Sequence, residues 1–282
     1  SMVNCLNKEF YFYKNMIKMV EQHIDEMDLR KKIETLMEYR MFPILFDHSD
    51  LSDDEKNIFY QRLIDLQYAI YLLDAHLEAN WEVDYLILQN HWSNIINKLK
   101  SFGINEENAS SYLTHIKKYE RHELELRSGK SPLRFDMEYF YFYKSCDVKL
   151  LRRLIYEKMN LTKTCGALAD WRYYDLITEV NDDVEDLMED LQFINGNRFL
   201  ISLLKLGKEK TLKEFTNFLN QIFLESELKL DQTHYKLKNV VFERTNQQVI
   251  ETLKLMIQTI ENLDEKLLGE SKLLSHLQQE HV

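Results

Sequence analysis

The chain has 282 residues, 45% of them hydrophobic, and a formal net charge of -11 at pH 7. This hydrophobic content supports a sizeable core and argues against a disordered chain. The acidic balance argues against a nucleic-acid partner, because contact with a phosphate backbone needs a basic patch, and the sequence has none of adequate size. An acidic protein can still hold phosphate groups through bound metal ions.

Helix-breaking residues are scarce, since the chain has only six glycines and two prolines. Long helices with short connections are therefore expected, and the predicted fold class is all-α. No linker, composition shift or internal repeat divides the chain, which predicts a single domain over residues 1–282. The three cysteines, Cys5, Cys146 and Cys165, are widely spaced and odd in number, as is typical of reduced thiols. With no predicted signal peptide or integral membrane segment, a cytoplasmic location is expected.

Hydrophobic periodicity predicts ten helices in chain order. Their ranges are 8–24, 29–47, 53–78, 81–101, 105–127, 134–160, 164–193, 197–206, 208–226 and 231–267. Ser52 and Asn105 each precede acidic residues and are predicted N-caps, because acids favour the first turn of a helix. Breaks are expected at Gly103, at 128–132 and at 195–196.

One acidic pair, Asp74 and Glu78, sits one helical turn apart within the third predicted helix. Large apolar residues share its helical face: Leu63, Ile70, Tyr71, Trp81 and Tyr85. Charges among apolar groups are costly to bury without a partner, so the pair is expected to meet a cation, a hydrogen-bond network or water in a cleft. The alternative is an exposed pair beside surface aromatic residues.

A second acidic cluster follows one face of the predicted helix around residues 175–189. Five acids fall within a sector of about 80°: Asp175, Glu179, Asp182, Asp186 and Glu189. Such a row repels itself unless water or cations neutralise it, and hard oxygen ligands suit Mg²⁺. The opposite face is apolar, so an ordinary surface helix with solvated acids remains the alternative.

Several motifs occur in the order found in one enzyme family. Glu38-Tyr-Arg-Met-Phe-Pro43 stands where that family has GKRxRP and matches it at Arg40. Asp74-Ala-His-Leu-Glu78 stands at the first DDxxD motif, and Asp182-Asp-Val-Glu-Asp186 is an intact second one. Weaker matches are His122-Glu-Leu-Glu125 for Gln-x-x-Asp, Tyr143-Lys144-Ser145 for Lys-Thr, and Gly196-Asn197-Arg198 for Gly-Lys. The chain thus resembles the trans-type prenyl diphosphate synthases, the polyprenyl synthetase group of class I isoprenoid synthases.

The resemblance implies a single bundle of ten or more helices around a central cavity, and a homodimer. It implies Mg²⁺ ligation by Asp74, Glu78, Asp182, Asp183 and Asp186. Lys144 and Arg40 are the implied catalytic cations on diphosphate oxygens, and Arg198 is an implied substrate-binding residue. Ala69 and Ile70 would form the floor beneath the prenyl chain.

The implied function is Mg²⁺-dependent prenyl-chain transfer from an allylic prenyl diphosphate. The family's arginine pair after the first motif is missing, and Phe42 replaces a basic residue, so a terpene cyclase or lyase using one diphosphate is the alternative. Asn181, Glu185 and Glu189 have the spacing of the cyclase metal triad, with Glu185 in place of a hydroxyl residue. A non-catalytic helical partner or lipid-binding module is the further alternative.

Overall fold

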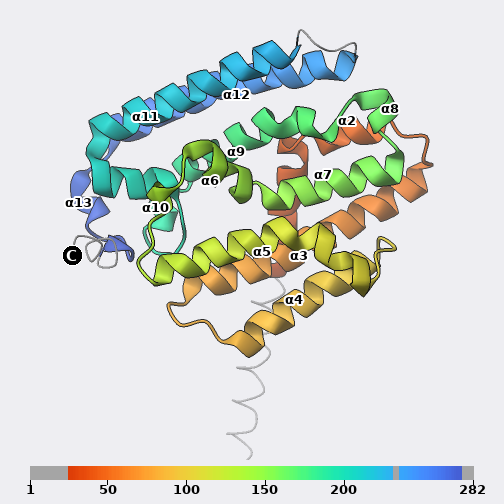
Figure 1. Ribbon diagram of the computed structural model, residues 1–282, viewed down its shortest axis with the longest axis horizontal. Helices are drawn as coiled ribbons and strands as arrows, with labels where there is room; N and C mark the ends of the chain where they lie inside the picture. The colour runs from red at the N-terminus through yellow and green to blue at the C-terminus, as the bar shows by residue number, and fades with distance from the viewer. Residues whose placement is uncertain (1–24, 231–234, 275–282) are drawn as a thin grey trace, which may run out of the picture.

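A computed structural model describes residues 25–230 and 235–274, and every regular element within these ranges is helical (Figure 1). The all-α prediction is therefore confirmed. Within the same ranges, no helix combines the length and the apolar character needed to cross a lipid bilayer. The predicted helix 8–24 and Cys5 lie outside the described residues, whereas Cys146 and Cys165 are buried free thiols.

The described helices follow one another with short connections. The first covers residues 25–39, and α2 (Phe42–Asp47), α3 (Asp53–Ala79), α4 (Tyr85–Lys100), α5 (Glu106–Arg127), the 3-10 turn η1 (Pro132–Arg134), α6 (Met137–Lys144) and α7 (Cys146–Met159) follow. Next come α8 (Thr162–Cys165), the 3-10 turn η2 (Leu168–Trp171), α9 (Arg172–Glu185), α10 (Leu187–Asp190), α11 (Arg198–Leu230), α12 (Lys236–Asn262) and α13 (Glu265–Leu268). Both predicted caps are confirmed: Ser52 forms a capping box on α3, and Asn105 accepts a bond from the third residue of α5.

Three predicted helices are divided in the structure. The helix expected over 29–47 is interrupted at Met41, whose φ of 62° is left-handed, and Pro43 then opens α2. The helix expected over 134–160 is split at Ser145. The helix expected over 164–193 is split at Gly166, with φ 87°, and again at Asp186. The predicted break at Gly207, with φ 81°, is confirmed inside α11.

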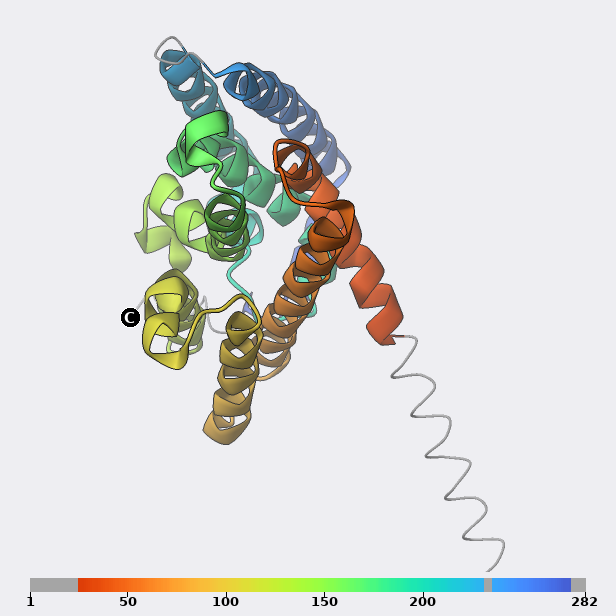
Figure 2. The same cartoon turned by 90° about the vertical axis from the view of Figure 1, so that its right-hand side faces the viewer.

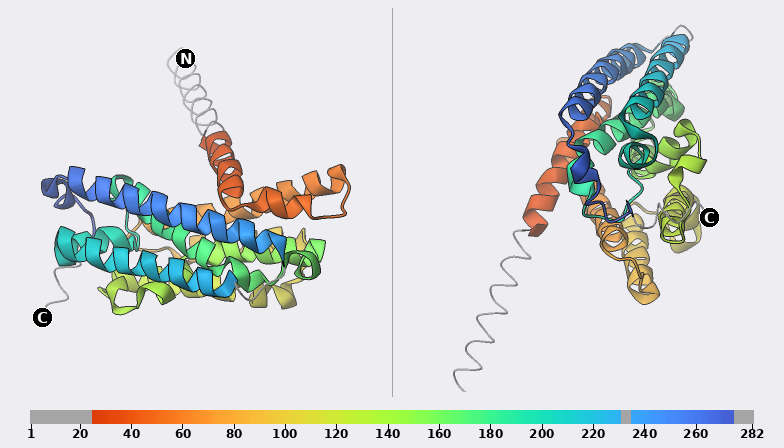
Figure 3. Two further views of the ribbon diagram at one scale, coloured as in Figure 1. Left: turned by 90° about the horizontal axis from the view of Figure 1, so that it is seen from above. Right: turned by 90° about the vertical axis from the view of Figure 1, so that its left-hand side faces the viewer.

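The described chain has two large hydrophobic clusters that meet along α9. The first involves mainly the helix 25–39 and α2, α3, α4, α5 and α7, whereas the second involves mainly α6, α9, α11 and α12. Figures 1, 2 and 3 show α11 and α12 side by side as a long pair, and both contact α9. Trp171 at the end of η2 and Tyr174 in the first turn of α9 belong to the first cluster, whereas Leu176 and Val180 of α9 belong to the second. The acidic row on α9 therefore lies at a seam between two apolar cores.

Candidate functional site

A cavity of about 720 Å³ opens between α3, α5 and α7 on one side and α9 and α10 on the other. Eight carboxylates line it: Asp74, Glu78, Asp147, Glu179, Asp182, Asp186, Glu189 and Asp190. Only three cationic side chains accompany them, namely Lys32, Arg40 and Lys144. The volume is typical of a small-molecule site. We call this space the acidic cavity.

The two predicted acidic motifs face the same cavity. The backbone N–H of Ile194, just beyond α10, donates to the carbonyl oxygen of Glu78 over 2.8 Å, which fixes the end of α3 beside the end of α10. Burial, together with the charges of Glu123, Asp190 and Asp186, raises the pKa of Glu78 to about 8. Burial also raises the pKa of Asp74 well above its ordinary value, and Glu78 adds repulsion. Carboxylates from α3 and α10 therefore interact across the cavity.

Two acids of the α9 row are buried rather than solvated. Asp175 is 2% exposed and Glu179 is 7% exposed, which rules out the surface-helix alternative for these two residues. Burial raises the pKa of Glu179 well above its ordinary value, with repulsion from Asp147 and Asp182. Burial likewise raises the pKa of Asp182 to about 7 and that of Asp186 to about 6. The protein holds these carboxylates where their ionised forms are disfavoured unless a cation arrives.

Asp175 belongs to the predicted acidic row but does not line the acidic cavity, because its side chain faces another part of the protein. Its Oδ1 accepts a hydrogen bond from Arg152 Nη2 over 2.7 Å, and both side chains are buried. The remaining four acids of the predicted row, Glu179, Asp182, Asp186 and Glu189, all line the acidic cavity. The single acidic face expected from periodicity is thus divided between two sites.

The two predicted cations both line the cavity, and each has an acidic partner. Lys144 forms an ion pair with the buried Asp183. Arg40 donates to Gln67 Oε1 over 2.9 Å and to Asp147 Oδ2 over 2.8 Å. The positive charge of Lys144 lowers the pKa of Glu78, Glu179 and Asp182, so its ammonium group lies among both acidic motifs.

Seven of the ten predicted site residues line the acidic cavity: Arg40, Ile70, Asp74, Glu78, Lys144, Asp182 and Asp186. The other three do not, which corrects their expected roles. Ala69 is fully buried in the first hydrophobic cluster, because it lies about 100° around α3 from Ile70. Asp183 is also fully buried and accepts bonds from the Tyr141 hydroxyl and from the Arg198 backbone.

Arg198 does not line the cavity, and its side chain forms hydrogen bonds that stabilise the fold. Its Nη1 donates to the carbonyl oxygens of Pro132 and Phe135. The preceding residues tie the acidic helix to α11, since Asn197 Nδ2 donates to the Asp183 carbonyl and to Asp190 Oδ2, each over 2.8 Å. The segment 196–198 thus connects α9, α10 and α11 through hydrogen bonds.

The alternative cyclase triad is not assembled in the structure. Asn181 is buried on the α12 side of α9, where its Oδ1 accepts a 2.8 Å bond from the Thr252 hydroxyl. Glu185 is exposed and is not part of the cavity wall, whereas Glu189 is. Asp182 and Asp186, the first and last aspartates of the DDxxD motif, both line the cavity.

Four further groups, at the acidic cavity or close to it, lay outside the predicted site residues. The sequence did indicate Glu179, because this residue belongs to the predicted acidic row, three residues before Asp182. Asp147 comes from α7 and Tyr39 from the first described helix, and no local pattern marked either. The Tyr39 hydroxyl is buried without a hydrogen-bond partner. Burial raises its pKa most, and the negative charge of Asp182 raises this pKa as well. This phenol therefore lies near the acids of α9.

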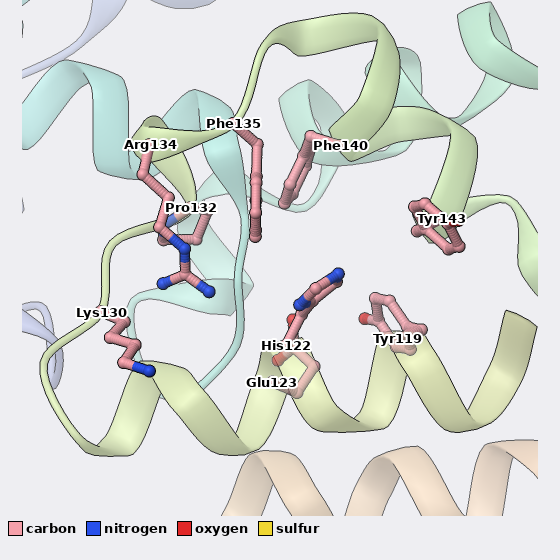
Figure 4. A pocket seen from close by; sticks show the side chains of 9 residues that line it. All are labelled: Tyr119, His122, Glu123, Lys130, Pro132, Arg134, Phe135, Phe140 and Tyr143. Carbon is pink, nitrogen blue, oxygen red and sulfur yellow. The ribbon is translucent and has the colours of Figure 1, made fainter.

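The fourth group, Glu123, lies just behind the cavity wall in a void of about 10 Å³ between α5 and α6 (Figure 4). Tyr119 lines both this void and the acidic cavity. Burial raises the pKa of Glu123 to about 7, and both of its oxygens accept from the Gly196 N–H over 3.2 Å. A Cβ at residue 196 would lie 2.6 Å from Glu123 Oε1, so this close approach requires glycine.

The carboxylates fit a metal that arrives with its substrate better than a preformed metal cage. Among residues 25–230 and 235–274, no three His, Cys, Asp or Glu side chains are grouped closely enough to hold a metal ion by themselves. Mg²⁺ commonly takes one or two protein carboxylates, substrate phosphates and several waters. The all-oxygen donor set and its raised pKa values fit that mode of binding.

The functional assignment depends on the sequence motifs and on the chemistry of the acidic cavity. Comparison of the chain with family models, with curated proteins and with solved structures finds no match.

Proposed function

We propose that the protein is a Mg²⁺-dependent enzyme that ionises an allylic prenyl diphosphate in the acidic cavity. The observation that carries the proposal is the excess of eight carboxylates over three cations in a space that Ile70, Ile116 and Phe193 also line. Carboxylates grouped around one cavity repel one another, and a metal-bound diphosphate supplies the cations that relieve this repulsion. The apolar side chains offer contacts to a hydrocarbon chain.

The residues of the cavity have distinct roles in this proposal. Asp74 and Glu78 on one wall and Asp182 and Asp186 on the other would hold Mg²⁺, which neutralises the diphosphate and stabilises the leaving group. Lys144 donates to diphosphate oxygens while Asp183 positions its ammonium group. The apolar lining excludes water from the carbocation.

Prenyl-chain transfer is the reaction that the order of motifs implies. It requires a second diphosphate site, usually built from basic residues. Arg40 and Lys144 are already ion-paired, which leaves few cations for a second anion. This observation favours a second candidate function, the cyclisation or hydrolysis of a single prenyl diphosphate. A homodimer belongs to the proposal through the resemblance alone, and light scattering would test it.

Product analysis tests the proposal directly. The protein is incubated with ten-, fifteen- and twenty-carbon allylic diphosphates, with Mg²⁺ or with EDTA, in the presence or absence of isopentenyl diphosphate. We expect Mg²⁺-dependent diphosphate release. Longer diphosphates that form only with isopentenyl diphosphate would establish chain transfer, whereas hydrocarbons or alcohols formed without it would establish the second candidate. Absence of release with all three substrates would overturn the enzyme proposal in favour of a binding module.

A pair of adjacent substitutions tests which residue forms the floor. Ile70→Phe adds a ring to the cavity wall and should shorten the preferred substrate or product, because the ring displaces chain carbons. Ala69→Phe instead overpacks the core and should lower stability by roughly 1–3 kcal/mol without changing the length profile. Activity with each chain length and the Tm of both variants show which of the two residues forms the floor. A shortened profile in Ala69→Phe alone would contradict the placement of Ile70.

A further inference from the structure

A second cavity, of about 390 Å³, has the opposite charge. It lies between α5, α6, α7, η2 and the start of α9, and shares only Cys146 with the acidic cavity. Four cationic side chains line it, namely Lys149, Arg152, Arg153 and Arg172, against one carboxylate, Asp175. We call it the basic pocket.

Arg152 has hydrogen-bond donors that the described protein leaves unsatisfied. The residue is 1% exposed, and its guanidinium lies 4.0 Å from the centre of the Trp171 ring. Nη2 donates to Asp175, but Nε and Nη1 are buried without a partner. A guanidinium has five N–H donors, and leaving buried donors unpaired costs free energy. An anion in the pocket would offer the missing acceptors.

Lys149 is the second cation of the basic pocket that could bind an anion. Its Nζ donates to the carbonyl oxygen of Phe142 over 2.6 Å, and within the described residues no carboxylate forms an ion pair with it. Burial, together with the charge of Arg172, lowers the pKa of Lys149 to about 7. A bound anion would restore the charged form.

The other two cations already have acidic partners. Arg172 donates to Glu138 over 2.9 Å, and Arg153 pairs with Glu157 over 2.9 Å. These pairs hold the two guanidinium groups beside the pocket but leave little net charge there. Arg152 is likewise paired with Asp175, so the unbalanced positive charge belongs to Lys149, which lies one turn from the unpaired donors of Arg152 on α7.

The rest of the wall is largely apolar. Phe142, Leu150, Leu168 and Ala169 come from three separate elements and face the same space as the cations. An inorganic anion alone would leave this surface in contact with water. A ligand with an anionic head and an apolar chain would satisfy both parts of the wall.

We propose that the basic pocket binds an anionic phosphate or carboxylate group attached to an apolar chain, with the anion held between Lys149 and Arg152. This site is separate from the acidic cavity, and its ligand requires no metal ion. The phosphate form has the advantage of more acceptor oxygens for the unpaired Arg152 donors. The inference does not depend on the proposed prenyl diphosphate chemistry.

Calorimetric titration with EDTA present tests this site, using inorganic phosphate, octyl phosphate and nonanoate below their micellar concentrations. We expect octyl phosphate to bind at least tenfold more tightly than inorganic phosphate. Lys149→Met should weaken octyl phosphate binding at least tenfold. Ala169→Trp should do the same by filling the pocket from an exposed position without changing any charge. Lys98→Met, on α4 outside the pocket, is the matched control for lost charge and should bind as the wild type does.

Tighter binding of nonanoate than of octyl phosphate would support the same pocket with a carboxylate head. Unchanged affinity in the folded Ala169→Trp variant would overturn the inference, and this variant remains decisive even where Lys149→Met fails to fold. Absence of binding by both chain-bearing probes, or equal affinity for inorganic phosphate, would also overturn it. Diphosphate release from prenyl substrates is measured separately, so failure of either proposal is distinguishable from failure of the other.

Discussion

Replacing Asp182 and Asp186 together by Asn should lower kcat/KM for Mg²⁺-dependent diphosphate release by at least about 100-fold, because both of the proposed metal-binding carboxylates on the α9 wall would be lost. The Tm should stay the same or rise. Burial and mutual repulsion raise the pKa of both groups in the folded protein, and a neutral amide relieves that penalty. Steady-state assays and thermal unfolding followed by circular dichroism measure the two effects.

Glu185→Gln is the matched control for this double variant. It removes a carboxylate from the same helix, but Glu185 is exposed and lies outside the cavity wall. Its activity should equal that of the wild type. Full activity in the Asp182/Asp186 double variant would refute the metal assignment, since these acids would then serve neither metal nor substrate.

Helical periodicity and motif matching each placed four of five acids at the cavity wall. The acidic row defined by angle contained Glu179, Asp182, Asp186 and Glu189, which line the cavity, but also Asp175, which does not. The DDxxD match added Asp183, which turns about 100° away to hold Lys144.

On α3 both approaches were correct only in part. The angular face of Asp74 included Ile70 and Tyr71, which line the cavity, and also Leu63, Trp81 and Tyr85, which do not. The motif-based floor added Ala69, which lies in the core. A residue's direction from a helix follows from its own position in the turn, so a local period carries this information and a transferred motif does not.

Tertiary structure decided the features that the sequence could not predict. Arg40 reaches the acidic cavity at the point where a left-handed residue and Pro43 divide a predicted helix, and its partner Asp147 is 107 positions distant in the chain. Glu123 approaches Gly196 across 73 positions. Pairings over such separations leave no periodic trace in a single sequence.

The most consequential long-range pair is Arg152 with Asp175. It removes the first acid of the α9 row from the acidic cavity and commits it to a pocket of opposite charge. One face of α9 therefore serves two sites. A single turn of helix separates Asp175 from Glu179, so the change from a basic to an acidic environment occurs over about 6 Å of helix axis.

Free energy of unfolding should fall as the pH rises from 5 to 7. The raised folded-state pKa values of Glu78 (about 8), Asp182 (about 7) and Glu123 (about 7) lie above the unfolded values of about 4. Between these limits the folded protein binds more protons than the unfolded chain. Stability from these groups is therefore complete below about pH 4 and is lost as the pH rises through their folded pKa values.

Each unit of pKa shift corresponds to about 1.4 kcal/mol, but the cavity opens to water and screening reduces the effect. A net loss on the order of 2 kcal/mol would lower the Tm by about 4–8 °C in a chain of this size. Three histidines with lowered pKa values, His91, His115 and His122, oppose part of the change, and Lys149 opposes it above about pH 7.

Glu78→Gln isolates the contribution of the cavity to this pH dependence. Its amide cannot ionise, so the difference in Tm between pH 5 and pH 7 should be smaller than in the wild type. Glu261→Gln, at an exposed position on α12, removes the same charge elsewhere and should leave the difference unchanged. Mg²⁺ with inorganic diphosphate should raise the wild-type Tm more at pH 7 than at pH 5, because the bound cations stabilise ionised carboxylates and a larger fraction of these groups is ionised at the higher pH. Equal Tm values for the wild type at pH 5 and 7, with the same equality in Glu78→Gln, would show that these carboxylates are not buried together and would remove the physical basis of the acidic cavity.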